Sequence, residues 1–182
     1  MKKLILLSDL WGIEKSHWLL QYKAILERYF EILYYDCREL GSITKDDLPI
    51  ENIHSQFVNG GIDKAVKQLL QTEREAFAVL GFSLGGCIAW KACLLGLKVQ
   101  HLFAISSTRL RYETAKPFAA IELLYGENDH FKPNSKWFQQ IEIKENLFQN
   151  EEHDLYQKKE IAAYFCKRII ENTQLRKEAP TP

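Results

Sequence analysis

Hydrophobic positions along the chain form short continuous runs, which alternate with segments where apolar residues recur every three or four positions. A short apolar run is typical of a strand buried on both faces of a parallel sheet, whereas the longer period predicts an amphipathic helix. Strands are predicted at 3–8, 31–36, 76–81, 99–106, 119–126 and, with a weaker pattern, 141–146. Helices are predicted at 17–30, from Ile62 onward, and at 84–95, 133–140 and 154–172.

This alternation predicts a single α/β domain with a mostly parallel sheet of about six strands and helices on both faces. Ser16 is the expected N-cap of the first helix. Residues 39–59 are polar and mixed, and we expect a long loop there. The domain is predicted to span 1–172, followed by a flexible polar tail at 173–182 that ends in Pro-Thr-Pro.

Composition narrows the possible partners and the compartment. Lys plus Arg and Asp plus Glu are equal at 24 each, which gives no reason to expect nucleic acid or an anionic membrane as partner. The chain has four cysteines and no Cys-x-x-Cys pair, which favours buried free thiols in a reducing cytoplasm. The apolar run near the N-terminus is shorter than a signal peptide requires, and no run approaches the ~20 residues of a membrane span. We therefore expect a cytoplasmic protein.

Polar residues with complementary chemistry follow three of the predicted strands. Ser83 stands in the stretch GFSLGG, directly after the third strand, while Asp129 follows the fifth and His153 the sixth. Sites in open parallel sheets gather beyond the carboxyl ends of the strands. A serine hydroxyl becomes a nucleophile when a histidine takes its proton and a carboxylate orients that histidine. The order Ser…Asp…His is the one that the G-x-S-x-G turn requires.

With these residues the chain resembles the α/β-hydrolase superfamily over about residues 3–170. GFSLGG resembles the nucleophile elbow, LLYGENDHFKP the stretch that carries the acid, and NEEHDLY the loop that carries the histidine. YYDCRELG resembles an Asp-x-Arg-x-x-Gly stretch found after the second core strand of many members. The resemblance implies that Ser83 is the nucleophile, His153 the general base and Asp129 the acid that orients the histidine.

The loop after the first strand departs from the family pattern. Members often carry His-Gly where this chain has Ser8-Asp9. By alignment the oxyanion hole takes the backbone amides of Leu84 and Leu10, with Trp11 as the alternative to Leu10. An amide donor requires no particular side chain, but Asp9 opposes an oxyanion if its carboxylate faces inward.

The segment between the fourth and fifth strands is short, and this predicts a site without a helical lid. Trp11, Phe131 and Ser106 are candidates for contacts with the substrate. Arg109 and Arg111 lie in the short segment. They are interpreted as part of a solvated loop, with contact to an acidic carrier protein or to a substrate carboxylate as the alternative.

Each assignment has a rival. Glu127 is the alternative acid to Asp129. The other histidines are His17, His54, His101 and His130. A metal site built from His130, Asp129, His153 and Glu152 is conceivable, but the histidines lack the helical spacing of metal ligands, so we expect no metal and no other cofactor.

The sequence thus predicts a serine hydrolase that cleaves a carboxylic ester or thioester of a small-molecule or carrier-bound acyl group through an acyl-serine intermediate. A narrower alternative is a methyl esterase that acts on a carrier-bound acyl chain, of the pimeloyl type. An alternative from a different class is a non-catalytic binding protein that keeps the fold. Asp9 in the oxyanion loop is the feature that favours this alternative. The oligomeric state is left open.

Overall fold

The computed structural model describes residues 1–44 and 48–174, and its centre is a six-stranded sheet with parallel pairing throughout. The strands are β1 Lys2–Leu7, β2 Phe30–Tyr35, β3 Glu75–Phe82, β4 Lys98–Ile105, β5 Ala120–Gly126 and β6 Leu147–Phe148. Their order across the sheet is β2-β1-β3-β4-β5-β6. The predicted α/β fold class is confirmed.

Side chains of the central strands alternate between two separate cores, one on each face of the sheet. In β1, Leu4 and Leu6 belong to one buried cluster, and Ile5 and Leu7 belong to the other. Both faces therefore need apolar residues, which explains why the strands are continuous apolar runs without polar alternation.

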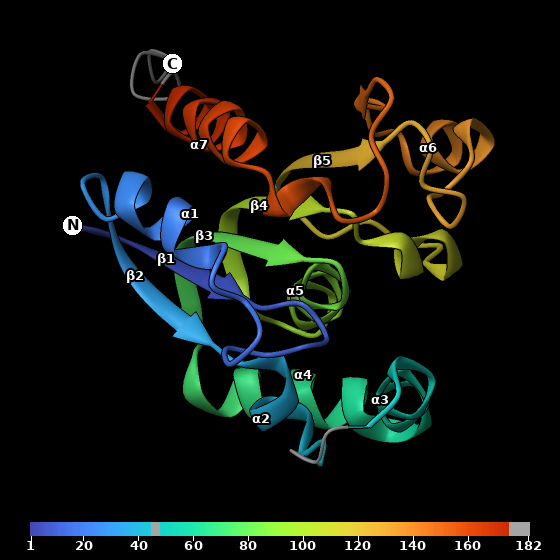
Figure 1. The fold of residues 1–182 in the computed structure, drawn as a ribbon. Coiled ribbons are helices and arrows are strands. Elements are labelled where there is room, and N and C mark those ends of the chain that lie inside the picture. Colours follow the sequence, from blue (N-terminus) through green and yellow to red (C-terminus); the bar gives the residue numbers. More distant parts are fainter. Residues whose placement is uncertain (45–47, 175–182) are drawn as a thin grey trace.

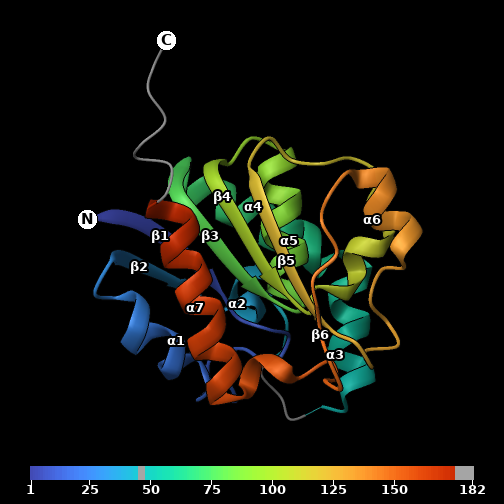
Figure 2. The same cartoon turned by 90° about the horizontal axis from the view of Figure 1, so that it is seen from above.

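Helices cover both faces of the sheet, as Figures 1 and 2 show. On one face lie α1 Leu19–Leu26 and α7 Lys159–Gln174. On the other lie α2 Cys37–Gly41, α4 Ile62–Thr72 and α5 Leu84–Leu94. The short helix α6 Ser135–Ile141 follows β5 and adds Trp137 and Phe138 to the second core. The predicted helices on both faces are confirmed.

The expectation of a long loop at 39–59 is wrong. This segment contains part of α2, then α3 Ile50–Gln56, and the chain kinks within Phe57–Gly61, where Asn59 and Gly60 have non-helical backbone angles, before α4 begins. The Asp36 side chain caps α2 by accepting hydrogen bonds from the Arg38 and Glu39 amides. Ile53 and Phe57 are buried one helical turn apart, which is the period of an amphipathic helix.

The sixth strand lies further along the chain than predicted. Residues 141–146 do not form a strand, because α6 extends to Ile141 and ends at Glu142, whose φ of 56° is left-handed. The strand is only Leu147–Phe148, paired with Tyr125 and Gly126 at the end of β5. Its short length places the following loop beside the carboxyl end of the sheet.

The first helix is shorter than the predicted 17–30, because Phe30 already pairs in β2. The prediction that Ser16 caps this helix is also wrong. No side chain caps α1, and the Ser16 hydroxyl donates a hydrogen bond to the carboxylate of Asp9 instead.

No helical lid is inserted between β4 and β5. The connection at 106–119 contains a single short element, the 3-10 helix η2 at Thr108–Tyr112. The carboxyl ends of the central strands are thus approached by η2 and by α3, which lies across the same end of the sheet in Figure 2.

The C-terminal helix α7 continues to Gln174, two residues past the predicted domain boundary. The rest of the predicted tail, 175–182, lies outside the described residues. Within the described ranges, no helix is long and apolar enough to cross a bilayer. Cys37, Cys87 and Cys166 are buried free thiols, and Cys93 is a partly buried one.

Replacing Phe165 by Ala tests the packing of α7 on the sheet. Phe165 is fully buried and meets the Phe103 ring edge-on at 6.2 Å. Phe165→Ala is expected to lower the free energy of unfolding by about 3–5 kcal/mol, measured by chemical denaturation. The control Leu20→Ala, at a side chain that is 63% exposed, is expected to change it by less than about 0.5 kcal/mol. Equal effects of the two variants would contradict this packing.

Candidate active site

Ser83 stands on a sharp turn between β3 and α5. Its backbone has φ 48° and ψ −112°, outside the regions that most L-residues occupy. The turn requires glycine on both sides. A Cβ at Gly81 would lie 2.4 Å from the amide nitrogen of Gly86, and one at Gly85 would lie 2.3 Å from the carbonyl oxygen of Ser8. The Ser83 amide donates to the Ile105 carbonyl at 2.8 Å, which fixes the turn to the end of β4.

A hydrogen-bonded relay runs from Ser83 through His153 to Asp129. The Ser83 Oγ lies 3.0 Å from His153 Nε2, and His153 Nδ1 lies 2.8 Å from Asp129 Oδ2. Because a carboxylate only accepts hydrogen bonds, Nδ1 carries the proton, and Nε2 is left to accept from the serine hydroxyl. The structure thus brings together the three side chains that the sequence singles out.

Asp129 is held in one orientation by its own loop. Its side chain is almost fully buried, and its second oxygen, Oδ1, accepts the Phe131 amide at 3.0 Å. The His153 side chain is 38% exposed, so it reaches the surface of the site. This combination leaves the carboxylate shielded from water while the imidazole stays accessible.

Backbone contacts tie the loop after β5 to the loop that carries His153. The Asn128 amide donates to the Glu151 carbonyl at 2.8 Å, and the Glu127 amide donates to the Phe148 carbonyl at 2.9 Å. Gly126 allows this approach, since a Cβ there would lie 2.3 Å from the Glu151 carbonyl oxygen. The rival acid Glu127 accepts the Asn150 amide with its carboxylate, so it supports the loop without contacting His153.

Asp9 is a buried residue of the loop that follows β1, and its two carboxylate oxygens accept hydrogen bonds from protein donors. Oδ1 accepts the Trp11 amide at 2.9 Å and the Ser16 hydroxyl at 3.3 Å. Oδ2 accepts the hydroxyl of Tyr156, from the 3-10 helix η3 at Leu155–Gln157, at 3.2 Å. Burial raises the pKa of the Asp9 carboxyl from 3.8 to about 6, although these hydrogen bonds lower it.

These contacts distinguish the two backbone amides that were considered for the oxyanion hole. The Trp11 amide is occupied by Asp9. Within 1–44 and 48–174, the Leu10 amide has no hydrogen-bond acceptor, and Leu10 lines the same cavity as Ser83. Leu84 is the first residue of α5, where the amide has no acceptor within the helix.

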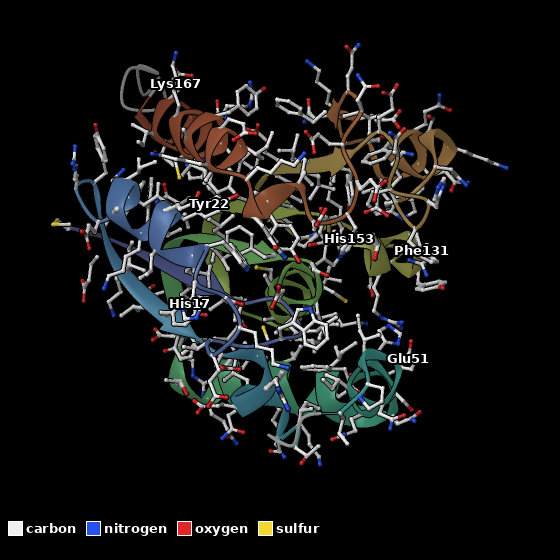
Figure 3. All side chains as sticks on the ribbon, in the orientation of Figure 1. His17, Tyr22, Glu51, Phe131, His153 and Lys167 are labelled. Atoms are coloured by element: carbon white, nitrogen blue, oxygen red, sulfur yellow. The ribbon has the colours of Figure 1, made fainter. Side chains whose placement is uncertain are left out.

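A cavity of about 520 Å³ opens beside Ser83. It is lined by Leu10, Ile50, Glu51, His54, Ser83, Leu84, Thr108, Arg109, Arg111, Phe131 and His153. Figure 3 shows His153 and Phe131 on one side of this region and Glu51, from α3, on the other. Of the three predicted substrate contacts, only Phe131 lines it. Ser106 is fully buried and Trp11 packs against the core and under Lys15, so the structure does not bring either to this cavity.

Sequence reasoning missed the wall that α3 contributes, namely Ile50, Glu51 and His54. The helical spacing of the apolar residues from Ile50 to Phe57 was the available signal. Arg109 and Arg111, interpreted from the sequence as part of a solvated loop, are only partly exposed and face the cavity.

The remaining histidines lie apart from the relay or do not join it. His101 is buried within β4 beside Phe103, and His17 lines a different cavity on the α1 face. His130 is exposed. The described ranges contain no group of three or more His, Cys, Asp or Glu side chains that is placed to hold a metal ion.

Comparisons with known proteins identify the fold. No family model and no curated protein matches the chain. A solved protein from Xanthomonas campestris pv. campestris, assigned to the α/β superfamily of hydrolases, matches with TM-score 0.68 and 18% identity over 94% of this chain and 99% of that one. Est1E from Butyrivibrio proteoclasticus, solved with ferulic acid bound, matches with TM-score 0.67 and 11% identity over 95% and 89%. Mouse α/β-hydrolase domain-containing protein 10 matches with TM-score 0.63 and 12% identity over 93% and 88%. The chain has the fold of the α/β-hydrolase superfamily.

Proposed function

We propose that the protein is a serine hydrolase that cleaves a carboxylic ester or thioester through an acyl-serine intermediate. The observation that carries the proposal is the pair of short contacts that joins Ser83 to His153 and His153 to Asp129, at 3.0 and 2.8 Å. The strained turn at Ser83 adds support, because strained backbone conformations cluster at functional sites.

In the first half of the reaction, Ser83 Oγ attacks the acyl carbon while His153 Nε2 takes the hydroxyl proton. The negative charge of Asp129 stabilises the resulting imidazolium. When the tetrahedral intermediate collapses, the bond to the leaving alcohol or thiol breaks, and that group receives the proton from His153. In the second half, His153 takes a proton from water as the water attacks the acyl-serine, and returns it to Ser83 as the acid leaves.

The amides of Leu84 and Leu10 are the proposed donors to the oxyanion of the tetrahedral intermediate. Both residues line the cavity with Ser83. The N-terminus of α5 adds the positive end of its helix dipole at the same place.

Asp9 has a positioning role in this proposal. Its carboxylate anchors the Trp11 amide on one side and the Tyr156 hydroxyl on the other, so it links the loop of Leu10 to the segment just after His153. The carboxylate oxygens of Asp9 accept three hydrogen bonds from the protein. They therefore do not occupy the place of the oxyanion. This arrangement weakens the non-catalytic alternative, which rested on Asp9.

The absence of a lid between β4 and β5 favours a substrate that is held partly outside the protein. The two arginines at the cavity suit the methyl esterase alternative, in which an acidic carrier presents the acyl chain. Fold likeness alone does not choose among the reactions that this arrangement supports.

Replacing Ser83 tests the nucleophile. With a 4-nitrophenyl ester of a short acid as substrate, Ser83→Ala is expected to lower kcat by at least about 10³-fold while the fold is retained. Ser135→Ala, at an exposed serine of α6, is the matched control and should keep the activity of the unmodified protein. Equal activity in Ser83→Ala and in the control would remove Ser83 from the reaction.

Replacing Asp9 by Asn tests how this buried carboxyl affects stability. The pKa of the Asp9 carboxyl is raised from 3.8 to about 6 in the folded state. The protonated carboxyl therefore stabilises the folded state fully below pH ~4, and this stabilisation is lost as pH rises through ~6. Asp9→Asn removes this dependence. The stability of the variant relative to the unmodified protein should therefore rise by roughly 2 kcal/mol between pH 4 and pH 8.

Urea denaturation at pH 4 and pH 8 measures this difference. Asp63→Asn, at an exposed carboxylate of α4, is the control and should show no comparable change. A constant difference between Asp9→Asn and the unmodified protein at both pH values would show that Asp9 is ionised in the usual range.

A further inference from the structure

The cavity beside Ser83 carries two arginines that no carboxylate neutralises. Within the described part of the chain, neither Arg109 nor Arg111 forms an ion pair. Both belong to η2 and are partly buried, and Glu51 on the opposite wall is the acidic residue among those that line the cavity. The wall formed by η2 therefore has an excess of positive charge close to the proposed nucleophile.

Arg111 is fixed by neutral acceptors. Its guanidinium donates to the carbonyl oxygens of Thr108 at 2.9 Å and Phe131 at 3.1 Å, and to the hydroxyl of Tyr112 at 2.8 Å. These contacts join η2 to the loop that follows Asp129. Because they supply no negative charge, the charge of Arg111 remains uncompensated while its side chain is held in place.

Arg109 is available for a ligand. Its guanidinium lies 5.2 Å from the centre of the Tyr112 ring, and it donates no hydrogen bond within the described residues. A partly buried guanidinium loses hydration and gains stability when an anion supplies acceptors. Burial is the larger cause of the lowered pKa of His54 in α3, and the charges of Arg109 and Arg111 lower it further. The charges of both arginines therefore act across the cavity on α3.

The geometry of the strand ends places this charge near the reaction. The Ser83 amide is bonded to Ile105, the last residue of β4, and η2 begins three residues later, at Thr108. Ser83 and Arg109 therefore come from neighbouring strand ends and line one cavity of about 520 Å³, a volume that suits a small molecule.

We propose that the substrate is a small ester or thioester whose acyl part bears a carboxylate at its far end, and that Arg109 binds this carboxylate. The planar guanidinium fork matches the two oxygens of a carboxylate. Arg111 adds to the positive potential, and Glu51 on the opposite wall directs the anion toward η2. This inference rests on the proposed function, since it assigns a substrate class to the same site.

Two substrates that differ in charge test the proposal. The 4-nitrophenyl hemi-ester of glutaric acid carries the carboxylate, and 4-nitrophenyl pentanoate has the same leaving group and acyl length without it. The unmodified protein is expected to show kcat/KM at least about tenfold higher for the hemi-ester. A preference for the neutral ester, or no preference, would overturn the proposal.

Variants assign the preference to particular side chains. Arg109→Gln should abolish the preference, so that the ratio of kcat/KM for the hemi-ester to kcat/KM for the neutral ester falls to about one. Arg109→Lys should keep part of it, since the charge remains and the fork is lost. Arg28→Gln, at an exposed arginine of the turn before β2, is the control and should keep all of it. A preference that survives Arg109→Gln would overturn the role of Arg109.

A second variant keeps the test decisive if Arg109→Gln does not fold. Glu51→Gln removes the acid that faces the arginines, so it should raise the ratio of kcat/KM for the hemi-ester to kcat/KM for the neutral ester. An unchanged ratio of the two would count against the proposed orientation of the anion. If the same acyl group were cleaved only on an acidic carrier protein, and this selectivity required Arg109, the proposal of a small substrate would be overturned.

Failure of this inference can be distinguished from failure of the proposed function. Hydrolysis of the neutral ester that is lost in Ser83→Ala would support the serine hydrolase, whatever the preference for charge. Hydrolysis of neither ester, nor of their thioester counterparts, would count against both.

Discussion

The backbone of Ser83 is held at a strained φ of 48° and ψ of −112° at the junction of β3 and α5, and the arrangement of the site depends on this turn. The adjacent glycines let β3, α5 and the loop after β1 approach within distances that no Cβ permits. The hydrogen bond from the Ser83 amide to Ile105 ties the turn to β4. The serine therefore projects from the carboxyl end of the sheet at the beginning of a helix, where backbone amides are free to bind negative charge.

Two buried carboxylates, Asp9 and Asp129, lie on either side of this turn, and their surroundings give them different roles. Asp129 contacts the histidine ring directly and is oriented by the Phe131 amide. The hydrogen bonds of Asp9 go to other residues than those of the relay, and they join the oxyanion loop to the segment that carries Tyr156, shortly after His153. In our proposal Asp129 stabilises charge during the reaction, whereas Asp9 keeps the two loops at a constant separation.

The sequence predicted the sheet and the three residues of the relay because both follow from local patterns. Continuous apolar runs mark strands that are buried on two faces, and a parallel sheet brings the residues that follow such strands to one edge. The wall formed by α3 was missed because Pro49 and the paired glycines before Ile62 indicate loops. The backbone does leave helical geometry at Gly60, with φ 118°, but this break is only a kink between α3 and α4. The role of Asp9 was not predictable from local pattern, since it depends on contact with Tyr156, 147 residues away. The short β6 likewise forms only because Tyr125 and Gly126 supply its partner.

Labelling with a fluorophosphonate probe, followed by mapping of the modified residue by mass spectrometry, is the most direct test of whether Ser83 is an activated nucleophile. The probe reacts with a serine whose hydroxyl is activated by a base and whose oxyanion hole accepts the phosphoryl oxygen. We expect a single adduct on Ser83, none on Ser83→Ala, and greatly slowed labelling of His153→Ala. Folded protein that remains unlabelled, or an adduct of equal yield in Ser83→Ala, would contradict this expectation.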